Sequence, residues 1–349
     1  MTHAFYDHMQ PDRTLVIEAS AVSPYTQHLD WYPDETVVNW DGGDIDETIL
    51  RTFLAGLSVV YTAETPYSYN LYTIARDMGV RTVCHVMPEF YRHAIELTLP
   101  VPDEVWLPTP WLADRIPHSR ILPVPIDRAH LPYRHRDRAD TFLHVIGRRA
   151  VWDRNGTQLV LKAFRKVRNP TTLVIRSQGR VPRVAVSRHV TLRIIEATDL
   201  DDYADLYADG DVMVLPRRFG GLCLPAQEAL STGMPVLMPN CSPNDALLPP
   251  GMLIPTRPGP PLRTQAGPVP TFDTSADALA AAIDRLIEDP AAVSSLSSAA
   301  DAIAHARSWE VLRSAYIDAL EAACAADRPV VLREAIRGPS AADLASPAP

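Results

Sequence analysis

The chain has 349 residues, which is too long for one ordinary core and typical of two domains. Hydrophobic residues make up 46% and charged residues 21%, as in water-soluble globular proteins. No apolar run reaches the ~18 residues of a membrane span, and the polar N-terminus lacks the segments of a secretory signal, so we expect a cytoplasmic protein. Four scattered cysteines, without a CxxC pair, predict neither a disulfide framework nor a metal site.

The net charge of −9 is distributed unevenly along the chain. Residues 1–50 carry ten acidic side chains against Arg13, whereas residues 141–195 carry twelve basic side chains against Asp153. A basic block of this kind suits an anionic ligand such as a diphosphate or a nucleic-acid backbone. Four of these basic residues lie on the polar face of one predicted helix, where a solvated surface is the simpler explanation.

In the first part of the chain, short apolar strand patterns alternate with helix-length segments. The strand patterns lie at 14–20, 36–40, 58–64, 81–87, 104–108 and 120–125. Apolar strands separated by helices predict a parallel sheet covered on both faces. We therefore expect a Rossmann-like α/β domain over residues 1–125. The composition of residues 126–140 turns to Arg, Asp, His and Pro, which predicts an exposed linker.

The same alternation restarts after the linker. Strand patterns lie at 141–147, 171–177, 190–195, 211–216 and 234–239. We therefore predict a second Rossmann-like α/β domain over residues 141–307, with a helix that starts near Gly156.

The segment after the last of these strands has less regular patterns. Residues 240–271 are rich in proline and are predicted to be irregular. Thr274 and Asp277 resemble a capping box that opens a helix over 275–288. The tail 326–349, rich in Ala, Ser and Pro, is predicted to be largely disordered.

The most informative stretch is DVMVLPRRFGGLCLPAQEALSTGMPVLMPN at 211–240. A strand enters a loop with two glycines, and a short helix follows between Pro225 and Gly233. Such a loop presents free backbone N–H groups and a positive helix end, which predicts a phosphate-binding site. The residues expected to form it are Arg217, Arg218, Gly220, Gly221, Leu222, Cys223 and Leu224. An ordinary strand-loop-helix crossover, with Glu228 exposed, is the alternative.

This stretch resembles glycosyltransferase family 4, which consists of retaining enzymes of the GT-B fold. In that fold, two Rossmann-like domains face each other across a cleft. GGLCLPAQEALSTGMPV matches the family's loop, its second Glu and the strand that follows. By resemblance, Glu228 binds the ribose of a nucleotide sugar. Gly220 stands where the family's first Glu touches the donor sugar, so that contact is expected from other residues, such as Arg217 or Arg218.

A second segment, FLHVIGRRAVWDRNGTQLVLKAF at 142–164, resembles the loop in which the family's Arg and Lys hold the donor diphosphate. Arg148 matches the Arg and Asn155 replaces the Lys, while Arg154 beside it supplies a cation. The other expected donor contacts are Gly147 and Arg149, together with the backbone donors of the helix start at Gly156 and Thr157.

Two further resemblances concern the whole chain. SWEVLRSAYIDAL at 308–320 resembles the family's closing helix, so the segment 308–325 is expected to cross back to the first domain. The combination of DRNGT and PRRFGGLCLP resembles a subgroup found in actinobacteria and their phages.

Candidate residues outside these motifs carry weaker signals. His85 ends a predicted strand, and ligands of α/β sheets bind beyond the strand ends. Similar enzymes often use a His at this place to touch the donor sugar. A histidine buried in the core is an equally good explanation. Glu64 and Glu89 follow strands and are candidates to orient an acceptor hydroxyl, although exposed loop acids are commoner. Glu196, in the segment 195–197, is expected beside the nucleobase.

Other function classes are excluded or weaker. Neither GxGxxG nor GxxxxGK[ST] occurs, so no nicotinamide site or P-loop is predicted. Asp44 and Asp46 form a DxD sequence, but they lie at a helix start and not at a strand end. The first hypothesis is a retaining transferase without metal or cofactor that uses a UDP-, GDP- or ADP-linked sugar. A non-catalytic sugar-nucleotide-binding homologue is the second, and an epimerase is a further alternative.

The acceptor is ranked from charge alone. The acidic first fifty residues would repel a phosphate backbone within a Debye length of ~8 Å, so a glycan, small molecule or protein is expected first. Modified DNA is the second expectation, because arginines gather from the end of the first domain through the linker. These are Arg115, Arg120, Arg128, Arg134, Arg136 and Arg138.

Overall fold

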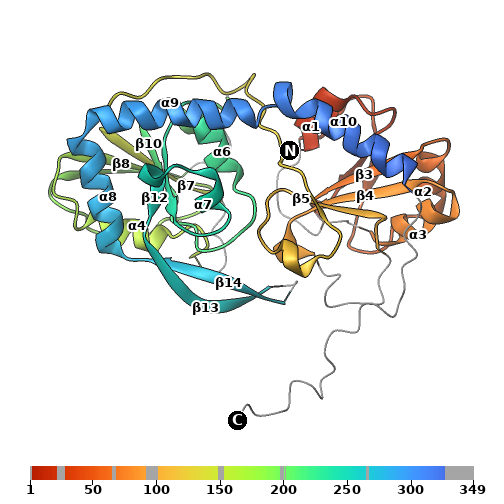
Figure 1. Cartoon of the computed structure of the whole chain (residues 1–349), viewed down its shortest axis with the longest axis horizontal. Helices are drawn as coiled ribbons and strands as arrows, with labels where there is room; N and C mark the ends of the chain where they lie inside the picture. The colour runs from red at the N-terminus through yellow and green to blue at the C-terminus, as the bar shows by residue number, and fades with distance from the viewer. Residues whose placement is uncertain are drawn as a thin grey trace, which may run out of the picture.

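A computed structural model describes residues 2–21, 28–64, 68–91, 101–147, 153–196, 200, 202–264 and 267–326. Two α/β domains lie side by side, each built around a parallel sheet (Figure 1). In the described part of the chain, no helix has the length and apolar character needed to cross a membrane.

The first domain contains two sheets where the sequence predicted one. A two-stranded parallel sheet pairs β1 (Leu15–Glu18) with β2 (Thr36–Asn39). The four-stranded sheet has the order β3-β4-β5-β6, and all its pairs are parallel. Its strands are β3 (Val59–Glu64), β4 (Arg81–Val86), β5 (Glu104–Leu107) and β6 (Arg120–Ile121).

Short helices surround these sheets. They are α1 (Thr2–Met9), η1 (Leu29–Trp31), α2 (Glu47–Leu54), α3 (Asn70–Asp77), η2 (Pro88–Phe90) and η4 (Ala113–Arg115). Asp46 caps α2, because its Oδ1 accepts from the N–H groups of Thr48 (2.8 Å) and Ile49 (3.2 Å). This role as a helix cap accounts for one carboxylate of the DxD sequence.

The second domain is built on a six-stranded parallel sheet with the order β12-β11-β10-β7-β8-β9. Its strands are β7 (Thr141–Gly147), β8 (Thr171–Ser177), β9 (Val190–Glu196), β10 (Val212–Val214), β11 (Val236–Pro239) and β12 (Leu253–Ile254). The chain starts in the middle at β7, builds outward through β8 and β9, and returns to place β10 on the other side of β7. The strand order therefore reverses between β7 and β10, and α/β sheets bind ligands beyond the strand ends at such a switch point.

Helices cover this sheet and close its core. They are α4 (Thr157–Phe164), α5 (Asp205–Ala208), α6 (Leu224–Ser231), α7 (Asn244–Leu247), η6 (Pro250–Met252), α8 (Ala276–Glu288) and α9 (Pro290–Ala306). Ser275, rather than Thr274, caps α8 by accepting from the N–H of Ala278 (3.0 Å). Asp289 caps α9 in the same way, through the N–H of Ala292 (2.9 Å).

The proline-rich segment contains an antiparallel hairpin, which the sequence had not predicted. Its strands are β13 (Thr256–Thr264) and β14 (Gly267–Thr274). Val269 is fully buried in a small cluster with Trp111 and Leu112 of the first domain. Arg115 also donates to the backbone carbonyl of Pro268. The hairpin therefore extends from the second domain to the first (Figure 1).

Nine of the fifteen residues of the segment 126–140 are exposed, as expected of a linker, but the segment is also anchored to the second domain. Arg136 is only 3% exposed, and its guanidinium donates to the backbone carbonyls of Arg134, Gly210 and Thr232. The N–H of Arg136 donates to the Ser297 hydroxyl at 2.9 Å. These bonds fix the segment on the second domain.

The last described helix, α10 (Trp309–Ala325), contacts α1, β3 and β4 of the first domain. Trp309, Tyr316 and Ala319 are buried in a cluster with Val83 and Trp106. Small and aromatic residues on one helix face therefore complete the core of the first domain.

Candidate functional site

The clearest anion-binding feature lies at the start of α6, beyond the switch point. Cys223 precedes the helix and provides no side-chain cap, and its carbonyl accepts from the N–H groups of Ala226 (3.1 Å) and Gln227 (3.2 Å). From Gly221 to Leu224, no backbone N–H has an acceptor among the described residues. Four unpaired donors at a helix N-terminus form a site for phosphate or for oxygen atoms of a sugar.

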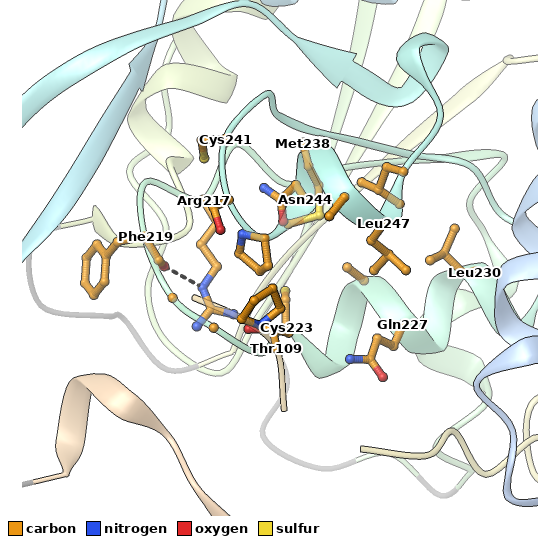
Figure 2. A pocket seen from close by; sticks show the side chains of 18 of the residues that line it. Thr109, Arg217, Phe219, Cys223, Gln227, Leu230, Met238, Cys241, Asn244 and Leu247 are labelled. Atoms are coloured by element: carbon orange, nitrogen blue, oxygen red, sulfur yellow. Dashed lines mark hydrogen bonds between the residues drawn. The ribbon is translucent and has the colours of Figure 1, made fainter. Parts of the chain in front are cut away.

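Arg217 holds this loop in shape. Its Nε donates to the Phe219 carbonyl at 3.0 Å (Figure 2), and its Nη1 donates to the Leu222 carbonyl. Its side chain is 11% exposed, so the cation lies largely inside the junction. Arg218 points elsewhere, because its Nε pairs with Asp273 Oδ1 of β14 at 2.9 Å. We expected both arginines to add charge at the site, but the charge of Arg218 is neutralised by the hairpin.

Gly220 makes room for two guanidinium groups. A Cβ atom at this position would lie 2.5 Å from Nη2 of Arg154 and 2.5 Å from Nη2 of Arg217. The backbone φ of Gly220 is +128°, which also favours glycine. Both cations therefore occupy the space that a larger side chain at position 220 would fill.

Arg154 and Glu89 form an ion pair between the two domains. Arg154 Nη2 bonds Glu89 Oε1, and Arg217 Nη2 lies 4.0 Å from the same oxygen. Arg154 also stacks on Phe219, with 4.8 Å between its Cζ and the ring centroid. Glu89 lies on η2 just after β4 and is 1% exposed. Its burial between two cations excludes the alternative that it is an exposed loop acid.

The N-terminus of α4 does not offer the backbone donors that we expected at Gly156 and Thr157. The N–H of Thr157 donates to Asp153 Oδ1 (2.8 Å), and the N–H of Gln158 donates to Asp153 Oδ2 (3.0 Å). A capping carboxylate both occupies these donors and repels phosphate. The backbone donors at the start of α4 therefore have acceptors within the protein, and the open helix N-terminus of the site is that of α6.

Asn155 and Gly156 shape the loop between β7 and α4. Asn155 Nδ2 donates to the Ile146 carbonyl at 3.0 Å, so the amide anchors the loop to the end of β7. Gly156 has φ of +74°, and a Cβ there would lie 2.6 Å from the Pro216 carbonyl oxygen. This close approach brings Arg154 next to the loop after β10, where the N–H of Arg218 donates to the Arg154 carbonyl at 3.1 Å.

Glu228 lies on α6 and is held by two tyrosines. Its Oε2 accepts from the hydroxyl of Tyr203 at 2.8 Å and from the hydroxyl of Tyr207. Among the described residues, no hydrogen bond reaches its other carboxylate oxygen. The carboxylate is therefore fixed in orientation with one oxygen left to accept from a ligand diol.

His85 lies in the core of the first domain, which favours the alternative of a core histidine over a contact with the donor sugar. Its imidazole is fully buried, with ring centroids of Tyr61, Trp106 and Tyr316 at 6.1 to 6.2 Å. Nδ1 lies 3.1 Å from the hydroxyl of Tyr61. Burial lowers the pKa of His85 to about 4, so the ring is neutral near pH 7. It is a core histidine beneath α10.

Several expected site residues lie wholly or partly outside the described residues. Arg148 and Arg149 lie outside them. Gly147 and Glu64 are placed by their backbone alone, in β7 and β3. Glu196 ends β9, and its Oε1 accepts from the N–H of Val181 at 2.8 Å, which ties the carboxylate to the neighbouring loop.

A small pocket lies beside the loop 217–223. Thr109 and Pro110 of the first domain line it together with Gly220 and Arg307. Gln227 and Leu230 on α6, and Asn244 and Leu247 on α7, form its other walls (Figure 2). Its volume of about 80 Å³ is far below the ~300 Å³ of ordinary ligand pockets, so the pocket by itself does not hold a nucleotide sugar.

Sequence reasoning missed the residues that support the motifs. Asp153 lies three residues before the N-cap Gly156, which is not the spacing of an ordinary helix cap, so no sequence signal identified it. Tyr203 and Tyr207 lie in an acidic helical stretch and carry no motif. Among the described residues, no group of three or more His, Cys, Asp or Glu side chains is arranged to hold a metal ion.

Comparisons with known proteins agree with this geometry. Residues 141–289 match the family described as Glycosyl transferases group 1. No curated protein sequence matches the chain.

Solved structures resemble the whole chain. HepE from Anabaena, in complex with UDP and glucose, aligns with a TM-score of 0.66 at 13% identity, over 92% of this chain and 95% of that one. A glycosyltransferase from Rickettsia africae gives 0.61 at 10% identity, over 92% and 93%. Sucrose-phosphate synthase from Thermosynechococcus elongatus gives 0.57 at 15% identity, over 84% and 85%. The α/β GT-B fold predicted from the sequence is therefore confirmed, and the fold together with the group 1 match indicates a glycosyltransferase.

Proposed function

We propose that the chain moves a sugar from a nucleotide-sugar donor to an acceptor hydroxyl, with retention at the anomeric carbon and without a metal ion. We also propose that it is a cytoplasmic member of the family 4 subgroup that its motifs resemble. The observation that carries the proposal is the meeting of two arginines and one open helix N-terminus at the switch point. Arg154, Arg217 and the N–H groups of residues 221–224 all face one junction between the domains.

In the proposed reaction, the bond between the anomeric carbon and the donor diphosphate breaks as the acceptor oxygen bonds to that carbon on the same face. The acceptor proton passes to the departing phosphate oxygen. Negative charge grows on the diphosphate as its bond breaks, so Arg154, Arg217 and the α6 amides stabilise the transition state more than the ground state. These groups are already in place, since Arg217 is bonded to the loop and Arg154 is packed on Phe219.

Glu228 is proposed to bind the donor ribose. Tyr203 and Tyr207 hold one of its carboxylate oxygens, and the other has no partner among the described residues. A fixed carboxylate close to an anion site can accept from both hydroxyls of a ribose. Among UDP, GDP and ADP sugars we place UDP first, because HepE has been solved with UDP and glucose.

A glycan, small molecule or protein is proposed as the acceptor, ahead of modified DNA. The six arginines that favoured DNA all have partners inside the protein. Arg120 pairs with Glu104, Arg128 with Asp301 and Arg138 with Asp140, while Arg115, Arg134 and Arg136 donate to backbone carbonyls. The ion pairs of Arg120, Arg128 and Arg138 weaken their attraction for a phosphate backbone, and the bonds of the other three arginines restrict how they can reach one.

The test is a screen of UDP-, GDP- and ADP-sugars, in which release of the nucleoside diphosphate is measured with and without acceptors. We expect release with at least one donor and a product with retained anomeric configuration. Arg154→Ala should lower this release, and Arg165→Ala is its control, because Arg165 is the exposed residue that follows α4 and donates to the Ala185 carbonyl. Tight donor binding without turnover would favour the non-catalytic homologue. An altered sugar that stays on its nucleotide would identify an epimerase.

A further inference from the structure

Glu89 has an unsatisfied atom that the proposed function leaves unexplained. Its Oε1 faces Arg154 and Arg217, whereas its Oε2 is buried and has no hydrogen-bond partner among the described residues. Leaving a buried acceptor unpaired is unfavourable, so such an atom in a folded protein calls for an explanation such as a bound ligand or a role in catalysis.

We propose that Glu89 accepts a hydrogen bond from a hydroxyl of the donor sugar, and so sets the enzyme's preference for a nucleotide sugar over the free nucleoside diphosphate. This inference rests on the proposed function. It assigns the sugar contact to the first domain, although the diphosphate is held by the second.

The position of the cations identifies the ligand group. Arg154 and Arg217 both lie against Glu89 Oε1 and also against Gly220, where a Cβ atom would meet both guanidinium groups. When these cations hold a diphosphate, a hydroxyl that reaches Glu89 must lie a few ångströms from the phosphate. The sugar bonded to that phosphate meets this requirement by its covalent connection, whereas an acceptor molecule meets it only after independent binding.

No other described carboxylate is available for this contact. Within the described part of the chain, Glu89 is the only acidic side chain in ion-pair distance of Arg154 or Arg217. The loop itself does not supply one at position 220, because that residue is glycine and its φ of +128° disfavours a side chain. The carboxylate that reads the sugar is therefore carried by η2 of the opposite domain.

This arrangement gives Glu89 opposite effects on two ligands. Its negative charge reduces the attraction of the two arginines for a bare diphosphate, because like charges close together repel. Its hydrogen bond to a hydroxyl favours the sugar-bearing ligand, since bonds to charged groups are worth about 1.5–3 kcal/mol, or roughly tenfold or more in affinity. A merely structural role would instead change both affinities in the same direction.

The experiment measures dissociation constants of the Glu89→Gln variant by calorimetry for three pairs of ligands: UDP with UDP-glucose, GDP with GDP-mannose, and ADP with ADP-glucose. For the pair that binds the unmodified chain, we expect the variant to bind the nucleoside diphosphate more tightly and to lose about tenfold or more of its preference for the sugar-linked form. Glu104→Gln is the matched control, because Glu104 lies in β5 and pairs with Arg120 away from the junction. This control should leave the preference unchanged.

Hydrolysis of the same nucleotide sugar by water, without acceptor, separates the donor role from an acceptor role. We expect Glu89→Gln to slow hydrolysis and transfer alike. Slower transfer with unchanged hydrolysis would place Glu89 on the acceptor and overturn the inference. Equal changes in both affinities would also overturn it while leaving the proposed function intact. If the unmodified chain binds none of the six ligands, the proposed function and the inference both fail.

Discussion

Replacing Arg154 with Ala tests the ion pair that joins the two domains. The change leaves Glu89 buried at 1% exposure, with Arg217 at 4.0 Å as its nearest remaining cation. Removing one partner of a buried ion pair destabilises a protein by about 3–5 kcal/mol. Arg217 offsets part of this loss, so we expect about 2–3 kcal/mol, which corresponds to a decrease in Tm of roughly 5–10 °C.

The double variant Arg154→Ala/Glu89→Gln separates stability from catalysis. Removing the stranded carboxylate should restore most of the lost stability, with a coupling energy of about 1–3 kcal/mol between the two sites. Turnover should stay roughly 10²–10³ below that of the unmodified chain in both variants, because the cation that stabilises the leaving diphosphate is absent.

The assays are urea unfolding followed by circular dichroism, and release of nucleoside diphosphate from the donor found in the screen. Unchanged turnover in Arg154→Ala would refute the assignment of Arg154 to the diphosphate. If the double variant is no more stable than Arg154→Ala, the buried carboxylate is not the source of the destabilisation.

Three further predictions concern parts of the fold that support the site. Gly156→Ala should destabilise the chain by about 2 kcal/mol or more in urea unfolding, because φ is +74° and the new Cβ would meet the Pro216 carbonyl at 2.6 Å. The control Gly79→Ala has a similar φ of +80° but open space around the new Cβ, so it should lose only about 1 kcal/mol; equal losses would contradict the close approach at Gly156. The folded-state pKa of His85 is about 4, against the ordinary 6.5, so between these pH values the unfolded chain binds a proton that the folded chain does not. The free energy of unfolding should therefore fall by up to about 3 kcal/mol as the pH drops from 6.5 to 4; His85→Gln should flatten this dependence, and an unchanged slope would refute the role of His85. Arg136→Ala should lower Tm, because it leaves buried carbonyls unpaired, but it should not alter salt-sensitive DNA binding in a gel shift. Loss of DNA binding at an unchanged Tm would instead favour DNA as the acceptor.

The sequence predicted the parts of the site that are local in the chain. The strand before Arg217, the glycine loop and the helix that carries Glu228 follow from short-range signals, namely apolar runs and the preference of Pro and Gly for helix ends. The switch point was not predicted, because an alternation of strands and helices indicates a parallel sheet but not the order of its strands.

Contacts between distant residues were beyond such reasoning. Arg154 and Glu89 are 65 positions apart and lie in different domains, so no local pattern connects them. The side of the sheet to which His85 points depends on the register of β4 against its neighbours, because one residue of shift reverses every side chain. The hairpin 256–274 was missed because its prolines oppose a strand assignment, and an isolated two-stranded hairpin with edge positions tolerates them.

A crystal structure with the nucleoside diphosphate of the active donor tests the central claim most directly. The account predicts that the diphosphate lies within hydrogen-bond distance of Arg154 and of at least two N–H groups from residues 221–224, and that it makes no contact with the capped N–H groups of α4. A diphosphate bound at the start of α4, with Asp153 displaced from Thr157, would contradict it.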